Sequence, residues 1–350
     1  MRRTLAQPAT SFALPGALEA TAPPERRGLA RDAVRLLVGT PKGVMHHAFH
    51  DLPSLLHPGD LVVVNTSATL PAAVDLARGD RAPHLHVAAT LDDGSWVVER
   101  RLADRSGPDL VTPRAGAVVK LPGGLRLTLV AAHPDAGAQV SRLWRATPSS
   151  AAPPADYLAR HGRPIAYAYS AGPFPLADYQ TVFGVQPGSA EMASAARPFT
   201  PAVVVGLARR GVAVAPVVLH CGVSSPEPHE PPMDERFAVP APTARAVNST
   251  RTAGGRVVAV GTTVTRALET VAAADGSVTA GQGWTSLVLG PERPARVVTG
   301  LVTGLHAPQA SHLSLLEAVA GPDLVRRAYD AALRERYLWH EFGDASLFLP

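Results

Sequence analysis

Several stretches of the chain are apolar at nearly every position, instead of alternating between apolar and polar residues. Residues 61–64 follow a Pro-Gly-Asp turn and read Leu-Val-Val-Val, and residues 212–219 and 256–260 have a similar character. A strand without alternation is typical of the interior of a sheet that is covered on both faces. These stretches therefore predict buried strands of one sheet.

Segments with helix signals lie between and after these strands. Thr200 followed by Pro201 predicts a helix start, and Gly211 predicts its end. The same reasoning predicts helices over residues 241–252, 263–274, 311–320 and 323–337, and a further strand over 297–302. Alternation of strands and helices predicts a mixed α/β main domain.

The predicted secondary structure is different between residues 74 and 154. Short β-like pieces alternate there with Gly, Pro and Asp turns, and they cover residues 85–90, 95–100, 125–130 and 139–145. This rhythm predicts a small all-β, barrel-like domain inserted in the larger fold, with residues 146–154 as its exit linker. The main domain would then be discontinuous and comprise residues 1–73 and 155–350.

The amino-acid composition restricts the class of protein but does not indicate a function. The chain has 350 residues, of which 46% are hydrophobic and 18% charged, the balance of a folded protein long enough for two domains. The net charge of +4 is carried almost entirely by arginine, since Lys42 and Lys120 are the only lysines. A mildly basic surface is compatible with RNA binding but also common in enzymes without nucleic-acid partners.

The single cysteine and the lack of long apolar runs exclude other classes. Cys221 can form no intramolecular disulfide and no cysteine-rich metal site, so we expect no bound metal. Arg2 and Arg3 are followed by no unbroken apolar stretch, and no run approaches the roughly 20 residues that span a bilayer. We expect a cytoplasmic monomer without membrane contact.

The strongest candidate for a binding site is the turn after the strand at 256–260. Gly261 is followed by Thr262 and Thr263, which open a helix whose first N–H groups and dipole can hold an anion. Arg266 and Glu269 follow Thr262 at i+4 and i+7, so the three share one helix face and could address one ligand. The alternative is a capped helix with a surface Arg–Glu pair.

Histidines and one tryptophan are weaker candidates. His220 and Cys221 end the strand at 212–219, and we interpret Cys221 as a buried structural residue. His306 follows another predicted strand and could act as an acid or base near neutral pH. Trp284 could stack on a nucleobase or pack in a core. His84 and His86 share a strand face, and we interpret them as a surface pair without a third metal ligand.

Collinear motifs carry a resemblance over nearly the whole chain. They are Phe49-x-Asp51-Leu52-Pro53, Pro58-Gly59-Asp60, Asn65, Pro71, Tyr179-Gln180-Thr181-Val182-Phe183, Gly188-Ser189, Phe199-Thr200-Pro201, Leu219-His220-x-Gly222, Glu235, Val239-Pro240, Gly261-Thr262-Thr263-x-x-Arg266-x-Leu268-Glu269, Gly283-Trp284-Thr285, Leu305-His306-x-Pro308 and Phe342-Gly343-Asp344-Ala345. In this order they resemble the S-adenosylmethionine:tRNA ribosyltransferase-isomerase family of queuosine biosynthesis.

The resemblance implies an enzyme without a cofactor that uses S-adenosylmethionine (SAM) as a ribosyl donor. Such an enzyme transfers and isomerises the ribosyl group onto 7-aminomethyl-7-deazaguanine in a tRNA anticodon stem-loop, and it releases adenine and methionine. The sulfonium acidifies the C5′ hydrogens, so a modest base can form an ylide-like carbanion in a dry site.

The resemblance also implies roles for individual residues. His220, Glu235, His306 and Asp344 are the acid/base candidates, and the residues alone do not choose among them. The implied substrate-binding residues are Asn65, Tyr179, Gln180, Ser189, Glu191, Arg197, Phe199, Thr200, Gly261, Thr262, Thr263, Arg266, Glu269 and Trp284. Among these, residues 261–263 and Arg266 would hold SAM, with Glu269 orienting them.

The sequence departs from the family pattern in the segment that precedes Phe199. The family usually has an apolar run there and a histidine where this chain has Pro198, whereas Glu191 and Arg197 add two charges. Elsewhere Thr66, Ala68, Ala73 and Gly304 replace amides and arginines that are usual in the family. A buried charge is costly unless it is paired, so we expect Glu191 and Arg197 to pair with each other or with a ligand.

These departures predict a retained SAM site with an altered acceptor site. Two alternatives stay open. The chain could be a diverged enzyme that acts on a small-molecule amine or nucleoside, or a relative that binds SAM or RNA without catalysis.

Overall fold

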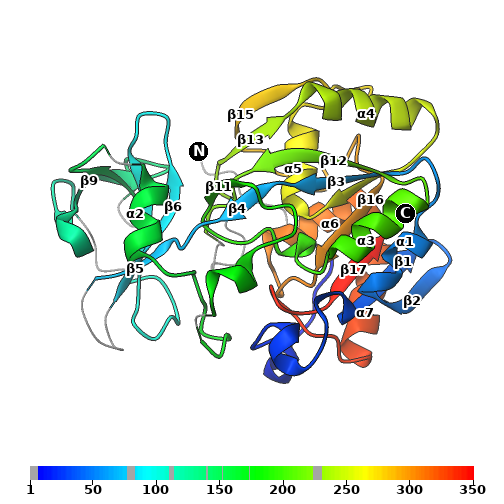
Figure 1. Ribbon diagram of the computed structural model, residues 1–350, viewed down its shortest axis with the longest axis horizontal. Helices are drawn as coiled ribbons and strands as arrows, with labels where there is room; N and C mark the ends of the chain where they lie inside the picture. Colours follow the sequence, from blue (N-terminus) through cyan, green and yellow to red (C-terminus); the bar gives the residue numbers. More distant parts are fainter. Residues whose placement is uncertain are drawn as a thin grey trace.

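The computed structural model describes residues 7–76, 83–109, 114–138, 141–151, 153–172, 174–223 and 231–350. Within these residues a nine-stranded sheet forms the centre of the larger part of the molecule (Figure 1). Its order is β15 (Gly281–Thr285), β13 (Glu235–Val239), β12 (Ala213–Leu219), β3 (Leu61–Asn65), β14 (Val257–Val260), β16 (Gly300–Gly304), β17 (Ala345–Phe348), β1 (Arg35–Thr40) and β2 (Gly43–Ala48). Strands β12, β3, β14 and β16 run parallel.

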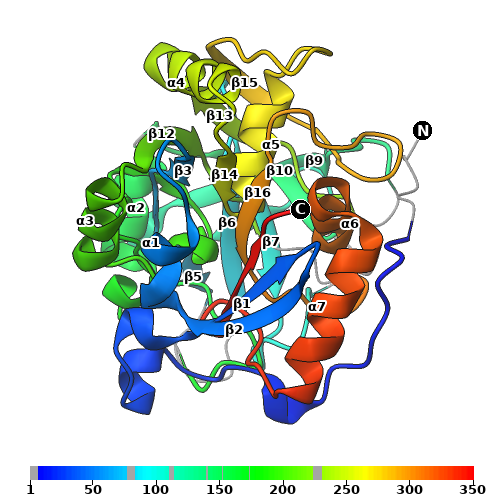
Figure 2. The same ribbon diagram turned by 90° about the vertical axis from the view of Figure 1, so that its right-hand side faces the viewer.

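Helices cover both faces of this sheet, as Figure 2 shows. The helices on one face are α4 (Ala241–Thr252), α5 (Thr262–Thr270), α6 (Ser311–Ala320) and α7 (Pro322–Arg334), and those on the other are α1 (Leu52–Leu55) and α3 (Pro201–Arg209). The described chain also contains short 3-10 helices: η1 (Gly16–Leu18), η2 (Pro24–Arg27), η3 (Arg31–Ala33), η4 (Phe49–Asp51), η5 (Pro122–Gly124), η6 (Leu176–Tyr179) and η7 (Ser194–Ala196).

The continuous apolar sequence of β3 follows from this double covering. Leu61 and Val63 pack in the core under α4 to α7, whereas Val62 and Val64 pack under α1 and α3. All four side chains are buried. Complete burial of each such side chain stabilises the fold by about 1.5–3 kcal/mol relative to exposure, so a polar residue at any of these positions would lose that contribution.

A second sheet contains six antiparallel strands in the described part of the chain and lies at the left of Figure 1. Its order is β5 (Ala73–Asp75), β6 (His84–Thr90), β7 (Trp96–Arg101), β10 (Leu143–Pro148), β9 (Arg126–His133) and β8 (Val118–Lys120). Helix α2 (Pro154–His161) packs on this sheet through Leu158. A parallel pair, β4 (Ser67–Thr69) and β11 (Gln186–Ser189), lies between the two large sheets.

The α/β prediction for the larger part is confirmed, and several element boundaries were wrong. The strand predicted at 297–302 is Gly300–Gly304, the helix predicted at 263–274 ends at Thr270, and the helix predicted at 323–337 ends at Arg334. Strand β10 continues to Pro148, so residues 146–148 are not part of a linker. The predicted start of that strand at 139 and 140 lies outside the described residues. The division into domains at residues 74 and 154 stays a prediction.

None of the helices that the structure describes has the length and apolar character required to cross a bilayer.

Candidate active site

A cavity of about 480 Å³ opens where the parallel strands of the nine-stranded sheet end. Cys221 after β12, Gly261 after β14 and Gly304 at the end of β16 all contribute to its lining. Carboxyl ends of parallel strands share one edge of a sheet, and ligands of open α/β sheets bind at that edge. The volume is in the range of small-molecule sites.

The start of helix α5 forms one wall, as the sequence predicted. Gly261 has φ of 95° and its N–H donates to the Val302 carbonyl at 2.7 Å, which fixes the turn at the end of β14. A Cβ at Gly261 would lie 3.3 Å from the Ala195 side chain, so a larger residue would be both strained and crowded. Thr262 and Thr263 follow and line the cavity.

Arg266 also lines the cavity, but its donors bind protein groups. The guanidinium donates to the carbonyl oxygens of Met233, Thr285 and Leu287 at 3.0 Å each, and it forms an ion pair with Glu235. Burial raises the pKa of Glu235, and Arg266 opposes that rise. Arg266 therefore fixes the segments around residues 233–235 and 285–287 at the edge of the site.

Two histidines form the wall next to α5. The rings of His306 and His312 stack with centroids 4.7 Å apart and planes 6° apart. Burial lowers the pKa of His306 well below its usual range and that of His312 to about 4, so both imidazoles are neutral at pH 7. His306 Nε2 lies 2.9 Å from Thr303 Oγ1. A neutral imidazole can accept a proton, which is what a general base requires.

Two tyrosine–glutamate pairs form another part of the lining. Tyr167 donates its hydroxyl hydrogen to Glu191, and Tyr169 donates to Glu341. The two tyrosine rings stack with centroids 6.0 Å apart, and the Tyr169 ring stacks on His340 at 4.0 Å. Burial, and then the adjacent glutamate, raise the pKa of each tyrosine well above 10, so both hydroxyls stay donors.

The six-stranded sheet supplies charged residues to the same cavity. Arg101 and Arg142 line it and both form ion pairs with the buried Glu99. His84 and His86 lie on the same face, directly across from Arg101 and Glu99 in the strand register, and both are buried. Our interpretation of these histidines as a surface pair was therefore wrong, because this face of the sheet is covered.

The predicted residues Asn65, Ser189 and His220 do not line the cavity but belong to a hydrogen-bonded group beside it. Ser67 Oγ lies 2.6 Å from Ser189 Oγ and 2.7 Å from His220 Nδ1, and Ser189 Oγ accepts from the Cys221 N–H at 2.9 Å. A Cβ on Gly188 would lie 2.4 Å from the His220 ring, so the ring is tightly packed. Asn65 accepts from the Leu219 N–H and donates to its carbonyl. These contacts join β3, β4, β11 and β12.

Glu191 and Arg197 do not pair with each other, contrary to one of our two expectations. Arg197 forms an ion pair with Glu25 and donates to the Asp178 carbonyl at 2.9 Å. Arg197 Cζ also lies 5.1 Å from the centre of the Phe342 ring. Arg197 thus fixes the N-terminal segment, while Glu191 lines the cavity.

Several other predicted residues lie away from the cavity and hold the fold. Glu269 is buried and accepts from the backbone N–H groups of residues 296–298, about two helical turns along α5 from Thr262. Asp344 accepts from the Arg35 and Leu338 N–H groups. The remaining contacts are Thr200 Oγ1 to Asp32, Gln180 to the Thr69 backbone, Phe199 edge-on to Phe49, and Trp284 Nε1 to Asp92 at 3.0 Å.

Of the predicted residues, the cavity is lined by Tyr179, Glu191, Glu235, Gly261, Thr262, Thr263, Arg266 and His306. Four further lining residues were not among the predicted ones: His312, Tyr167, Tyr169 and Glu341. One signal was present: Tyr167 and Tyr169 alternate, so they share a face of an extended segment. His312, the stacking partner of His306, could not be predicted from the sequence, because the stacking depends on how α6 packs against β16.

Among the described residues, no group of three or more His, Cys, Asp or Glu side chains is arranged to hold a metal ion. A sheet covered on both faces, with a small-molecule cavity at its strand ends lined by carboxylates, hydroxyls and neutral imidazoles, defines an α/β protein equipped for acid–base chemistry.

Comparisons with known proteins give the family. Residues 9–348 match the queuosine biosynthesis protein family, and the chain belongs to it. The S-adenosylmethionine:tRNA ribosyltransferase-isomerase of Acidiphilium cryptum is 35% identical, with 93% of this chain and 96% of that protein covered. The enzyme of the same name from Moorella thermoacetica is 35% identical, with 91% and 94% covered. The crystal structure of S-adenosylmethionine tRNA ribosyltransferase from Thermotoga maritima aligns with a TM-score of 0.53 and 28% identity, covering 97% of this chain and 99% of that one.

Proposed function

We propose that this chain is a SAM-dependent ribosyltransferase-isomerase of queuosine biosynthesis. It transfers and isomerises the ribosyl group of SAM onto 7-aminomethyl-7-deazaguanine in tRNA and releases adenine and methionine. The observation that carries the proposal is the similarity over more than nine-tenths of the chain to enzymes of that name. SAM is a substrate in this reaction, and the reaction requires no further cofactor.

We assign the SAM site to the start of α5. The N–H groups of the first turn have no partner within the helix, and the helix dipole favours negative charge there, so the SAM carboxylate fits this position. Thr262 and Thr263 add hydroxyls to the same wall. Arg266 acts by fixing the edge of this wall instead of binding the carboxylate itself.

We assign the base to His306. Of the four acid/base candidates, only Glu235 and His306 line the cavity, and Glu235 is held by Arg266 and by the Gly222 N–H at 2.9 Å. The neutral imidazole of His306 can take the C5′ proton next to the sulfonium and leave an ylide-like carbanion. Loss of adenine then opens the sugar to attack by the acceptor amine, and methionine leaves when the ribosyl group is transferred.

The acceptor would enter beside the six-stranded sheet. Arg105 lines that side of the cavity, and an arginine donor matches a phosphate group of an anticodon stem-loop, whereas Arg101 and Arg142 are ion-paired with Glu99. We also propose that residues 74–154 are an inserted domain, supported by their own six-stranded sheet. The remaining expectations, a cytoplasmic monomer whose partners are SAM and tRNA, belong to the same proposal.

One observation favours a second candidate, an enzyme that acts on a free amine or nucleoside. Glu191 lines the cavity in a segment where the family usually has apolar residues. A changed acceptor site with a retained SAM site would place such a difference on the acceptor side.

Incubation with SAM and candidate acceptors tests both candidates, with adenine and methionine measured by mass spectrometry. Release that depends on a stem-loop RNA containing 7-aminomethyl-7-deazaguanine supports the tRNA enzyme. Release that depends only on the free base or nucleoside supports the second candidate. Unchanged SAM under every condition contradicts both and favours a protein that binds without catalysis.

A further inference from the structure

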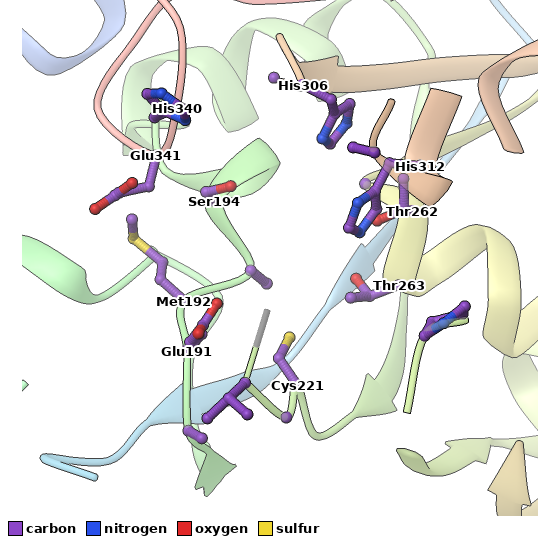
Figure 3. A pocket seen from close by; sticks show the side chains of 18 of the residues that line it. Glu191, Met192, Ser194, Cys221, Thr262, Thr263, His306, His312, His340 and Glu341 are labelled. Carbon is purple, nitrogen blue, oxygen red and sulfur yellow. The ribbon is translucent and has the colours of Figure 1, made fainter. Parts of the chain in front are cut away.

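The carboxylates of Glu191 and Glu341 line the cavity across from the start of α5. Figure 3 shows Glu191, Met192 and Glu341 on one side of the cavity and Thr262, Thr263 and His312 on the other. The two glutamates are far apart in the sequence, and each accepts a hydrogen bond from a tyrosine of one short segment. Because Tyr167 and Tyr169 stack on each other, the two tyrosine–carboxylate pairs are joined on one side of the cavity.

We propose that Glu191 and Glu341 bind the primary ammonium group of the acceptor, and that Glu341 removes its proton before the amine attacks the ribosyl carbon. This inference rests on the proposed function, and it identifies which residues recognise and activate the acceptor.

Electrostatics at Glu341 indicates a cationic ligand. No arginine, lysine or histidine forms an ion pair with Glu341 in the part of the chain that the structure describes. Burial, with a contribution from the negative charge of Glu191, raises the pKa of Glu341 to about 7, against the hydrogen bond from Tyr169. The Arg197 guanidinium lowers the pKa of Glu341 without forming an ion pair with it. An ammonium ion at the two carboxylates would add positive charge where burial disfavours the ionised form of Glu341.

With the SAM carboxylate assigned to the start of α5, the ammonium group of SAM is not the ligand of Glu191 and Glu341. In SAM the α-ammonium and the carboxylate are attached to the same carbon atom, so both lie at one end of the molecule. With the carboxylate at the start of α5, that ammonium also lies beside α5, whereas Glu191 and Glu341 lie on the opposite side (Figure 3). The amine that reaches the two glutamates therefore belongs to the second substrate.

The proton balance is simple. An alkylammonium ion has no lone pair and cannot attack carbon. Transfer of one proton from the ammonium to the Glu341 carboxylate gives a neutral amine and a neutral carboxylic acid, and the freed lone pair then forms the new C–N bond. A carboxylate whose pKa lies near 7 can accept this proton and release it to solvent after product formation.

The test compares two stem-loop RNAs that differ in one group. One contains 7-aminomethyl-7-deazaguanine and the other contains the neutral 7-cyano-7-deazaguanine. Dissociation constants are measured at constant salt for the unmodified protein, Glu341→Gln and Glu191→Gln. Glu292→Gln, which changes an exposed glutamate, is the control.

We expect the unmodified protein to bind the amine RNA about 10-fold more tightly than the nitrile RNA, as one buried charge pair allows. Each glutamate variant should reduce this preference to about 2-fold or less without weakening nitrile binding, while the Glu292→Gln control keeps it. Full preference in both glutamate variants would overturn the proposal. Weaker SAM binding by Glu341→Gln in calorimetry, with the amine preference intact, would instead assign the site to SAM and also overturn it.

A pH series tests the proton transfer separately. At pH 7 the rate of methionine release, which accompanies amine attack, should be about 100-fold lower for Glu341→Gln, in the range of general-base effects. At pH 9 solvent deprotonates more of the amine, so the deficit should shrink to a few-fold. A deficit that is independent of pH would overturn the base assignment. If the unmodified protein releases no adenine with any acceptor, the proposed function fails, whereas the amine preference in binding is still measurable.

Discussion

The imidazole ring of His306 lies flat against that of His312, with 4.7 Å between the ring centres. Both rings are half-buried and electrically neutral, and both border the cavity. The arrangement places an unprotonated nitrogen base on a wall adjacent to the start of α5, where we assign the SAM site.

The first prediction concerns the base. His306→Gln should lower the rate of adenine release by about 100- to 1,000-fold, because the group that accepts the C5′ proton is lost. The dissociation constant of SAM should change less than about 3-fold, since the anion site at α5 is unaltered. His57→Gln, which changes an exposed histidine, is the matched control. A variant that retains full activity would remove His306 from the mechanism.

The second prediction concerns acid stability. Burial lowers the pKa of His84 and of His312 to about 4, from 6.5 in the unfolded chain. The unfolded chain therefore binds more protons between pH 4 and 6.5, and stability falls as the pH falls through this range. Each histidine contributes a slope of up to about 1.4 kcal/mol per pH unit.

Urea unfolding at pH 7, 5.5 and 4.5 measures this slope. His84→Gln should have a shallower slope than the unmodified protein, whatever its stability at pH 7, and His57→Gln should not. Carboxylates whose pKa is lowered, such as Asp60, lose their contribution only below about pH 4 and are therefore separated from the histidines. Equal slopes in all three proteins would contradict the burial of His84.

The third prediction concerns Asp60, whose side chain is 3% exposed. Its carboxylate accepts hydrogen bonds from the Arg256 guanidinium and from the backbone N–H groups of His57 and Arg256. Burial alone would raise the pKa of Asp60, but these donors lower it. Asp60→Asn should reduce the free energy of unfolding by about 2–3 kcal/mol, because a charge-assisted buried pair is broken. Asp323→Asn breaks an exposed pair with Arg326 and should cost less than about 0.5 kcal/mol.

The fourth prediction separates fold from binding at Glu269. Its carboxylate accepts from the N–H groups of residues 296–298, so Glu269→Gln should destabilise the protein by about 1–3 kcal/mol through unsatisfied backbone donors. SAM binding, measured by calorimetry below the unfolding temperature, should stay within about 2-fold. A large selective loss of SAM affinity would instead support the role that the helix spacing predicted.

Local signals predicted the centre of the sheet better than its edges. Strands β3, β12 and β14 have continuous apolar sequences because helices cover them on both sides, and their positions were predicted. Strands β13 and β15 contain Glu235, Arg236 and two glycines, and their pairing depends on register with each other rather than on an apolar run. Such edge strands have no distinct pattern in one sequence.

The site was predicted where one local motif builds it and missed where distant segments meet. The turn at Gly261 is a strand–glycine–helix unit, and its place in the cavity follows from its own sequence. Glu341 lies beside Tyr169 through contacts between segments 172 residues apart, which no spacing rule contains. Glu269 lies outside the cavity lining although it shares a helix face with Thr262, because a shared face does not decide whether each residue on it meets the cavity or the protein interior.

The cavity is bounded by both large sheets, since Arg101 and Arg142 come from one and Thr262 from the start of a helix on the other. A molecule that fills the cavity therefore contacts both sheets at once and stabilises their junction. Because a ligand stabilises whatever conformation it binds, occupancy should slow amide hydrogen exchange in β7 and in the first turn of α5 together.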